Sequence, residues 1–264
     1  MDLKLNDKIA LVTGSTTGIG FATAKSLATE GATVIVNGRT PERVNSAVAQ
    51  IMAETGNSKV FGIAADLAQP EQIEKLVLQF PDVNILVNNA GAAQTKAFKD
   101  ISDEEWLSIY EMNVMSGVRL SRAYLDNMLK ADWGRIIFIS SESAIQIPVE
   151  MIQYGVSKIA QIGLSRGLAE MTVGTAVTVN TILPGPTSTE AISGFMKATA
   201  EQQGLSDEEM EKVFFTSMRG TSILKRFIEP AEIANLVTYV ASPLSSATNG
   251  ATLRADGGVI KSAI

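Results

Sequence analysis

A tyrosine and a lysine stand four residues apart in the stretch YGVSK at 154–158. On a helix, Tyr154 and Lys158 would leave from the same face, one turn apart. A free tyrosine titrates near pH ~10, and an ammonium group within a few ångströms would lower the tyrosine pKa because it favours the phenolate. Such a pair could give or take a proton at neutral pH. The same spacing also fits a packed tyrosine beside a solvated lysine, so other residues must decide between the two interpretations.

A serine-rich run, ISSES at 139–143, precedes this pair and contains Ser141. Neither histidine nor cysteine occurs in the 264 residues. Their absence excludes histidine acid–base catalysis, thiolate nucleophiles, disulfides and zinc sites with these ligands. An enzyme built from this sequence must therefore take its proton donor from tyrosine, lysine or a carboxyl group, and no metal site is expected.

The composition is typical of a soluble globular protein, with 45% hydrophobic and 19% charged residues. The net charge of −6 gives no support for a nucleic-acid partner, which usually requires a basic face. No apolar run is long enough to span a bilayer, and the first eight residues are too polar for a signal peptide. We therefore expect no membrane association and a cytoplasmic location.

Short apolar runs and helical patterns alternate along the chain. Strands are expected at 8–13, 33–37, 60–64, 85–87, 134–139, 176–182 and 251–255, and helices at 21–29, 41–54, 70–79, 102–129, 154–171 and from 230 onward. Such alternation is typical of parallel βαβ units. The sequence predicts an α/β fold with a doubly wound (Rossmann), mostly parallel seven-stranded sheet in a single domain, 1–264. The stretch 188–222 follows the ligand edge of a strand and is a candidate helical substrate lid.

The first expected strand runs into TGSTTGIG at 13–20 and then into a helix. Strand, glycine loop and helix are the context that a phosphate-binding turn requires. Gly14 would allow a tight turn, Gly18 would let the backbone approach a pyrophosphate, and Gly20 would let the helix pack closely on the strand. The exposed amides and the helix dipole would then favour an anion. A glycine turn after a strand is also common without any ligand.

The end of the second expected strand indicates which dinucleotide would bind. In NAD-binding folds an acidic residue about 20 residues past the glycines commonly bonds the adenosine ribose. Here that place holds Gly38, followed by Arg39 and Thr40. A guanidinium group can hold a 2′-phosphate with two hydrogen bonds, whereas an acid would repel it. Arg39 therefore predicts that NADP(H) is favoured over NAD(H).

Taken together, these motifs resemble those of the short-chain dehydrogenase/reductase family. The resemblance covers nearly the whole chain and rests on TGSTTGIG at 13–20, ADL at 65–67, NNAG at 88–91, Ser141, YGVSK at 154–158, PGPT at 184–187 and DGG at 256–258. It implies an oxidoreductase that interconverts a carbonyl and an alcohol by hydride transfer with a nicotinamide cofactor. Within the family, the chain looks similar to 3-oxoacyl-carrier-protein reductases.

The resemblance implies four catalytic residues. Tyr154 would be the general acid in carbonyl reduction or the base in alcohol oxidation, and Lys158 would lower its pKa and bond the nicotinamide ribose. Ser141 would donate a hydrogen bond to the substrate oxygen, and Asn113 would hold a water in a proton relay to the lysine. Cofactor contacts are implied for Gly14, Ser15, Thr16, Thr17, Gly18, Ile19, Gly20, Arg39, Thr40, Asp66, Leu67, Asn89, Ala90, Gly91, Tyr154, Lys158, Pro184, Gly185 and Thr187.

Two positions depart from the commonest family pattern. Thr17 stands where many NADP-using members carry a basic residue, so the predicted cofactor preference depends on Arg39 alone. Glu142 stands directly beside Ser141, where many members have a small or apolar residue. It could contact a polar substrate, but we expect it to be a solvated loop carboxylate.

Several functional alternatives stay open. The expected substrate is a small carbonyl or alcohol compound. A 3-oxoacyl-carrier-protein reductase would need a basic patch for its acidic carrier, and residues 170–179 contain no basic side chain. A non-catalytic dinucleotide sensor would not need Ser141, Tyr154 and Lys158 together. The expected helix 154–171 has apolar residues on more than one face, which predicts contact with another subunit in a dimer or tetramer.

Overall fold

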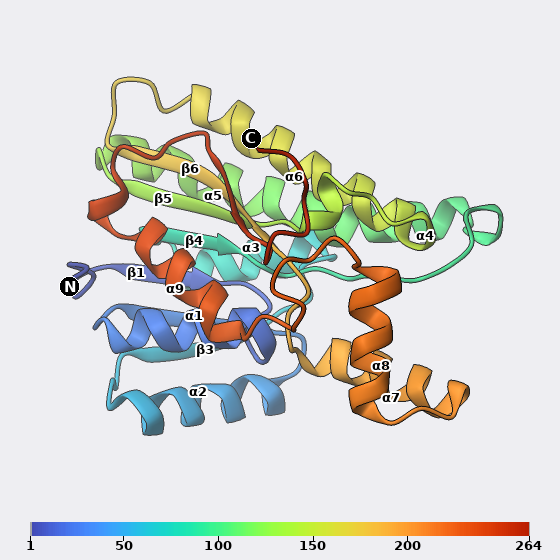
Figure 1. Cartoon of the computed structure of the whole chain (residues 1–264). Helices are drawn as coiled ribbons and strands as arrows, with labels where there is room; N and C mark the ends of the chain where they lie inside the picture. The colour runs from blue at the N-terminus through green and yellow to red at the C-terminus, as the bar shows by residue number, and fades with distance from the viewer. Residues whose placement is uncertain (1, 264) are drawn as a thin grey trace.

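Seven strands form a single sheet in the order β3-β2-β1-β4-β5-β6-β7 in the computed structural model, which describes residues 2–263 (Figure 1). The strands are β1 (Ile9–Val12), β2 (Thr33–Gly38), β3 (Val60–Ala64), β4 (Ile85–Asn88), β5 (Gly134–Ile139), β6 (Val177–Pro184) and β7 (Thr252–Ala255). Neighbouring strands are parallel, and Leu11 of β1 pairs with Ile35 of β2 on one side and Leu86 of β4 on the other. The prediction of a doubly wound sheet of seven strands is confirmed.

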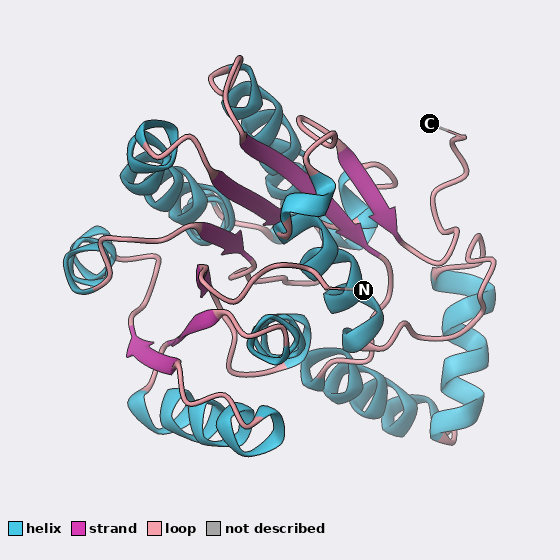
Figure 2. Cartoon of the chain, turned by 90° about the vertical axis from the view of Figure 1, so that its left-hand side faces the viewer, coloured by secondary structure: helices cyan, strands magenta, loops and turns pink. Residues whose placement is uncertain are grey.

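Helices cover both faces of this sheet, as Figure 2 shows. The helices of the described residues are α1 (Gly18–Thr29), α2 (Pro41–Thr55), α3 (Pro70–Gln79), α4 (Asp103–Tyr110), α5 (Ser116–Lys130), α6 (Ile152–Glu170), α7 (Glu190–Gln203), α8 (Asp207–Val213) and α9 (Pro230–Ala241). Local signals begin some of them: Ser102 and Glu105 form a capping box at α4, and Thr40 caps α2. None of the helices within residues 2–263 is both long and apolar enough to cross a membrane.

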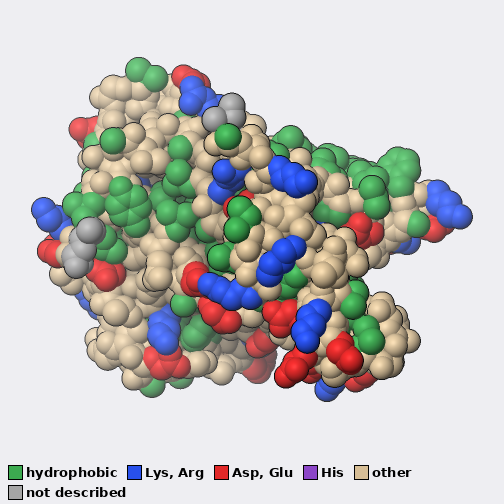
Figure 3. Space-filling view, in the orientation of Figure 1, with side chains coloured by type: hydrophobic (Ala, Val, Ile, Leu, Met, Phe, Trp, Pro, Cys, Tyr) green, Lys and Arg blue, Asp and Glu red, His purple; other side chains and the backbone are tan. Residues whose placement is uncertain are grey.

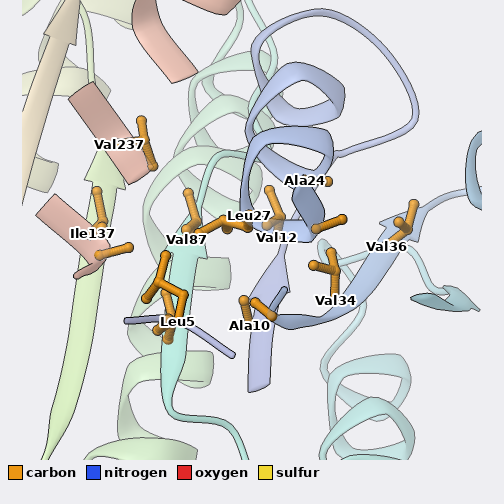
Figure 4. Packing of buried hydrophobic residues seen from close by; sticks show 14 of the residues in the cluster. Leu5, Ala10, Val12, Ala24, Leu27, Val34, Val36, Val87, Ile137 and Val237 are labelled. Atoms are coloured by element: carbon orange, nitrogen blue, oxygen red, sulfur yellow. The ribbon is translucent and has the colours of Figure 1, made fainter. Parts of the chain in front are cut away.

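Two apolar cores hold the helices to the sheet. One joins α1, α2 and α9 to one face and includes Leu27, Ile51 and Val237 (Figure 4). The other joins α3, α5 and α6 to the opposite face and includes Leu76 and Tyr124. Because helices cover both faces, the strands β4, β5 and β6 are buried along their whole length. The two cores together fix the edge at which the carboxyl ends of the strands meet.

The strand order reverses at β1 and β4, which pair although they are distant in the sequence. In open α/β sheets, ligands bind outside the carboxyl ends of the strands at such a switch point. Here the loops after the two strands approach each other closely. A Cβ added to Gly14 would lie only 2.9 Å from the Cα of Ala90. The topology thus places the glycine loop at 13–20 beside the NNAG stretch at 88–91.

The segment 188–222, which we call the helical insert, contains α7, α8 and a π-helical turn at Phe214–Met218. It projects beyond the end of the sheet, shown in orange in Figure 1. Its buried apolar residues form a third core of their own, which includes Met196, Met210 and Phe215. The ring of Phe215 also lies 5.0 Å from that of Phe227, centroid to centroid. Much of the apolar surface of this segment is therefore buried within the segment itself.

One predicted element differs from the structure. The helix expected at 102–129 continues from α4 into α5 without a break, but the five residues Glu111–Met115 form a π-helical turn within it. Such turns are rare and often accompany functional sites. This one carries Asn113, which is 1% exposed. The predicted helix is confirmed, but the π-helical turn within it was not foreseen, because apolar periodicity does not reveal a local widening of the backbone.

Candidate active site

A cavity of about 640 Å³ lies at the carboxyl edge of the sheet and is lined on one side by the helical insert. Of the predicted catalytic residues, Ser141, Tyr154 and Lys158 line it. The predicted cofactor residues that also line it are Thr17, Gly18, Ile19, Gly20, Asn89, Gly91, Pro184, Gly185 and Thr187. The predicted residues outside this lining are Asn113, Gly14, Ser15, Thr16, Arg39, Thr40, Asp66, Leu67 and Ala90.

Hydrogen bonds and close contacts hold the glycine loop in one path. Gly14 and Gly18 both have φ of +59°, in the left-handed region that glycine favours. The Asn89 Nδ2 donates to the carbonyl oxygens of Thr13, at 2.9 Å, and Gly14, at 3.0 Å. A Cβ added to Gly20 would lie only 2.4 Å from the Gly14 oxygen. Gly20 therefore permits contact between α1 and the loop itself, whereas the sequence predicted contact with the strand.

The loop fits the pyrophosphate of a dinucleotide. Thr17, Gly18 and Ile19, at the start of α1, line the cavity. Among the described residues, the first turn of α1 carries no acidic side chain. Backbone amides at a helix N-terminus, together with the helix dipole, favour an anion there. A bound nicotinamide dinucleotide would supply the hydride donor or acceptor.

Asn37, at the end of β2, also holds the loop and was missed by the sequence analysis. Its Oδ1 accepts a hydrogen bond from the Gly14 N–H at 3.2 Å, and its Nδ2 donates to the Ala65 carbonyl at 3.1 Å. Its backbone N–H donates to the hydroxyl of Ser15, which in turn donates to the Val12 carbonyl at 2.6 Å. The Ser15 side chain is thus buried within the loop, so the predicted cofactor contact at Ser15 would have to come from its backbone. The available signal for Asn37 was a polar residue at the end of an apolar strand.

The predicted adenosine contacts lie at the end of β2 and after β3. Arg39 and Thr40 are exposed, and the Thr40 hydroxyl accepts the N-capping hydrogen bond from the backbone of Arg43. Asp66 is half-buried. The side chain of Leu67 is 2% exposed and belongs to the core between the sheet, α3 and α5. Only the Leu67 backbone is therefore placed to serve as the predicted contact.

Tyr154 and Lys158 both stand on α6, as predicted, but burial dominates their chemistry. The Lys158 Nζ lies 5.6 Å from the centroid of the tyrosine ring and donates to the Ile139 carbonyl at 2.8 Å. Burial lowers the pKa of Lys158 to about 7. Burial also raises the pKa of Tyr154 to about 12, against a smaller lowering by the Ser141 hydroxyl. The expected lowering of the Tyr154 pKa by Lys158 is not found: burial is the largest influence and raises this pKa, and the groups that lower it are Ser141 and Arg219.

Lys158 is joined to Asn113 through Gln161, which stands one turn further along α6. The lysine Nζ donates to the Gln161 Oε1 at 3.2 Å, and the Gln161 Nε2 donates to the Asn113 carbonyl at 2.6 Å. The Asn113 side chain donates to the Ser157 hydroxyl and to the Ala92 carbonyl, both at 2.9 Å. Asn113 is thus a buried and bonded neighbour of the catalytic set. Gln161 was missed, although its spacing of three from Lys158 places both on one helix face.

Glu142 is a buried carboxylate, and the expectation of a solvated one is wrong. It is 4% exposed, and its Oε2 accepts hydrogen bonds from the hydroxyls of Ser141, at 2.5 Å, and Ser143, at 2.9 Å. Its Oε1 accepts from the Nε of Arg219 at 2.8 Å. Arg219 belongs to the helical insert, 77 residues further along the chain. Sequence reasoning missed this ion pair because only the fold brings its two partners together.

Comparison with known protein families shows which family the chain belongs to. The family described as short chain dehydrogenase matches residues 8–203. The chain belongs to this family. It is accordingly an oxidoreductase that acts on CH–OH and C=O groups with NAD(P). The family and the reaction class predicted from the sequence are confirmed.

Similar proteins match this short-chain dehydrogenase over nearly its whole length. It is 47% identical over 262 residues to the uncharacterized oxidoreductase YvaG of Bacillus subtilis (strain 168), and the match covers 99% of each chain. It is 34% identical over 263 residues to the 3-oxoacyl-(acyl-carrier-protein) reductase FabG of Aquifex aeolicus (strain VF5), covering 98% of this chain and 100% of that one. The chain is also similar to L-sorbose reductase from Gluconobacter frateurii, whose crystal structure is complexed with NADPH and L-sorbose. The two sequences are 30% identical, the structures superpose with a TM-score of 0.93, and the match covers 99% of this chain and 100% of that one.

Proposed function

We propose that this short-chain dehydrogenase uses NADP(H) to interconvert a carbonyl and an alcohol in a small molecule, with Tyr154 as general acid or base. The observation that carries the proposal is that Tyr154 and Ser141 line the same cavity as the first turn of α1. An ordinary tyrosine, with a pKa near ~10, is already protonated at neutral pH, and burial raises the pKa of Tyr154 further. A protonated phenol suits carbonyl reduction, the direction that consumes a proton.

The other catalytic residues support this proton transfer. Ser141 stabilises the charge that develops on the substrate oxygen by donating a hydrogen bond to it. Lys158 is held by the Ile139 carbonyl and by Gln161, so its position relative to the tyrosine is fixed. Asn113 and Gln161 are positioning residues, because they act through the lysine.

The preference for NADP(H) is supported by Arg39. Its exposed guanidinium stands at the carboxyl end of β2, where NAD-binding folds commonly place an acid. The structurally similar L-sorbose reductase was crystallised with NADPH. We extend the same cofactor to this chain.

A small molecule is supported over an acyl carrier protein by the charges around the cavity. Its lining includes the carboxylates of Glu142, Glu150 and Glu190 and the cations of Lys158 and Arg219. An acidic carrier protein docks on a basic surface, because like charges at an interface are costly. The excess of carboxylates therefore disfavours the carrier-protein alternative. A sensor without catalysis would leave the assembled Ser–Tyr–Lys set unexplained.

We propose that the helical insert acts as the substrate lid. Ile192 and Phe195 of α7, together with Phe214 of the π-helical turn, line the cavity. The separate core of the insert would let it move over the cavity as one unit.

We also propose that the chain forms a dimer or tetramer. Val156 and Ile159 of α6 are 38% and 46% exposed, and Leu107 of α4 is 69% exposed. Figure 3 shows apolar side chains gathered on the side of the molecule where α4 and α6 lie. Apolar patches of this kind mark protein interfaces. Light scattering should give a two- or four-subunit mass, and a monomer would contradict this proposal.

A panel of small ketones, aldehydes and alcohols, assayed by nicotinamide absorbance with both cofactors, tests the proposed function. We expect at least one carbonyl compound to be reduced, faster with NADPH than with NADH at low cofactor concentration. With NADPH deuterated at the transferred position, mass spectrometry should find the deuterium on the carbinol carbon of the product. A panel without any turnover, in either direction, would contradict the proposed function.

A further inference from the structure

We call the part of the cavity lined by Ser141, Glu142 and Arg219 the substrate end. There the carboxylate of Glu142 is hydrogen-bonded to the predicted catalytic serine, Ser141. The Oε2 of Glu142 accepts hydrogen bonds from the hydroxyl of Ser141 at 2.5 Å, the backbone N–H of Ser143 at 2.6 Å and the hydroxyl of Ser143 at 2.9 Å. Its Oε1 is held by the Arg219 Nε at 2.8 Å. Glu142 lines the cavity although it is only 4% exposed. The carboxylate is therefore fixed in orientation, with Oε2 toward the serines and Oε1 toward the arginine.

This arrangement commits the only proton of the Ser141 hydroxyl. An ionised carboxylate accepts hydrogen bonds and cannot donate them, so the hydroxyl must donate to Glu142. The lone pairs of the Ser141 oxygen receive the Ser143 N–H at 3.1 Å. To donate to a carbonyl substrate, the hydroxyl must turn away from Glu142, which reduces the donors to Oε2 from three to the two that Ser143 supplies. Leaving a buried charged acceptor short of a donor is costly unless another donor replaces the lost one.

We propose that the substrate supplies this donor, as a hydroxyl group on the carbon next to its carbonyl. The substrate hydroxyl donates to the Oε2 of Glu142, which frees the Ser141 proton for the carbonyl oxygen. The substrate class is then an α-hydroxy ketone or α-hydroxy aldehyde, and the product is a vicinal diol. This inference rests on the proposed function: the carbonyl carbon receives a hydride from the reduced nicotinamide, and the carbonyl oxygen receives the phenol proton of Tyr154. The neighbouring hydroxyl keeps its own proton.

The charges around Glu142 favour a neutral substrate over an anionic one. The guanidinium of Arg219 is paired with Glu142, donates to the Met218 carbonyl at 2.9 Å and lies 3.9 Å from the Oε1 of Glu150. Two carboxylates thus balance the one arginine at this end of the cavity. A substrate carboxylate would have to compete with Glu142 for that arginine, whereas a hydroxyl donor adds to the existing bonds. Hydroxyl groups therefore fit this end of the cavity better than acid groups.

Hydroxyacetone and methoxyacetone test the inference, because both carry an oxygen on the carbon next to the carbonyl and only the first can donate a hydrogen bond. With NADPH, the wild-type kcat/KM for hydroxyacetone should exceed that for methoxyacetone by about tenfold or more. In Glu142→Ala, which removes the acceptor, the ratio should fall toward one. Glu142→Gln keeps the size of the side chain but removes its charge, and the ratio should fall severalfold. Glu150→Gln is the matched control: it removes a carboxylate of the same cavity that has no bond to Ser141, and the ratio should persist.

An equilibrium measurement separates this inference from the proposed function. Binding of the two ketones to the complex with oxidised NADP, measured by calorimetry, requires no turnover. It should show the same selectivity in the wild type and its loss in Glu142→Ala. Equal affinities and equal kcat/KM values for the two ketones in the wild type would overturn the inference while leaving the reductase intact. Selective binding without reduction of any carbonyl would instead contradict the proposed function alone. Retention of the wild-type ratio in both Glu142 variants would also overturn the inference.

Discussion

The two ends of the cavity differ in whether backbone or side chains form them. The cofactor end is mainly backbone: glycines of the loop approach one another within van der Waals contact, and the side-chain amides of Asn37 and Asn89 tie the loop to its neighbours. The substrate end is mainly side chains, with Glu142 from the sheet edge held by Arg219 from the helical insert. The insert also has a core separate from those of the sheet.

This difference has a functional meaning. A pyrophosphate is the same in every nicotinamide dinucleotide, so backbone amides and close-packed glycines suffice to recognise it. Substrates vary, and side chains on a separately packed segment can change without disturbing the sheet. We therefore expect substitutions at the cofactor end to act through packing and those at the substrate end to act through charge.

The largest effect on stability is expected at the substrate end. Arg219→Ala leaves the buried carboxylate of Glu142 without its counter-ion, which should lower the free energy of unfolding by about 3 kcal/mol. The NADPH affinity should stay unchanged, because Arg219 lies at the other end of the cavity. Urea denaturation and NADPH titration would measure both quantities. The control is Arg226→Ala, which breaks an exposed ion pair with Glu232 and should have little effect on stability. If Arg219→Ala and Arg226→Ala were equally stable, the expected difference between the buried and the exposed ion pair would be contradicted.

Lys158 stands between the two ends and makes stability depend on pH. Burial lowers its folded-state pKa to about 7 from the ordinary lysine value of 10.5. Between these values the unfolded chain binds a proton that the folded chain does not, so stability rises with pH in this window and is lost as pH falls through it. The wild type should gain on the order of 1 kcal/mol per pH unit relative to Lys158→Met between pH 7 and pH 9.5. Urea denaturation at several pH values measures this difference, and Lys75→Met, at an exposed position of α3, is the control. If the stability difference between the wild type and Lys158→Met did not change with pH, the burial of the amine would be contradicted.

Two helical glycines sharpen the contrast in packing. A Cβ added to Gly20, in α1, would lie 2.4 Å from the Gly14 oxygen, so Gly20→Ala should lower the free energy of unfolding by about 1–3 kcal/mol and weaken NADPH binding. Among residues 2–263, nothing lies within 4 Å of a Cβ added to Gly194 in α7. Gly194→Ala should therefore raise the free energy of unfolding by about 0.5–1 kcal/mol. Thermal or urea denaturation that finds the two variants alike would remove the contrast.

The smallest effect on stability is expected at Arg39, whose substitution should change the choice between cofactors. Arg39→Asp replaces an exposed cation at the end of β2 with an acid, so the preference for NADPH over NADH should fall about tenfold or reverse. Stability should stay near that of the wild type, because the side chain is exposed. Fluorescence titrations with both cofactors measure the ratio, and Arg122→Asp on α5 controls for the change of charge. Equal affinities for the two cofactors in the wild type would contradict the assigned role.

The regular parts of this molecule could be predicted from the sequence because their signals are local. The strands at 60–64 and 134–139 and the helix at 70–79 have the predicted bounds, since each is an apolar run or period with a clear start and stop. The glycine loop was found for the same reason. The predicted cofactor contacts at Ser15 and Leu67 do not say whether the side chain or the backbone acts, and the structure shows that both side chains are buried.

Other features could not be predicted because they depend on contacts between distant segments. Glu142 and Arg219 form an ion pair although they are 77 residues apart in the sequence, and no local sequence pattern predicts it. The tyrosine pKa was expected to fall because spacing reveals the nearby lysine but does not reveal how strongly burial acts on both groups. The π-helical turn that carries Asn113 interrupts a helix whose periodicity looks continuous.

The rate of carbonyl reduction by Tyr154→Phe tests the central claim most directly. The variant removes only the phenolic hydroxyl, so NADPH should bind with the wild-type Kd while kcat for the best carbonyl compound of the panel falls by roughly 10²–10⁴-fold. Tyr239→Phe, at an exposed tyrosine of α9, should keep the wild-type rate. A Tyr154→Phe enzyme that binds NADPH and reduces the carbonyl at the wild-type rate would contradict the account.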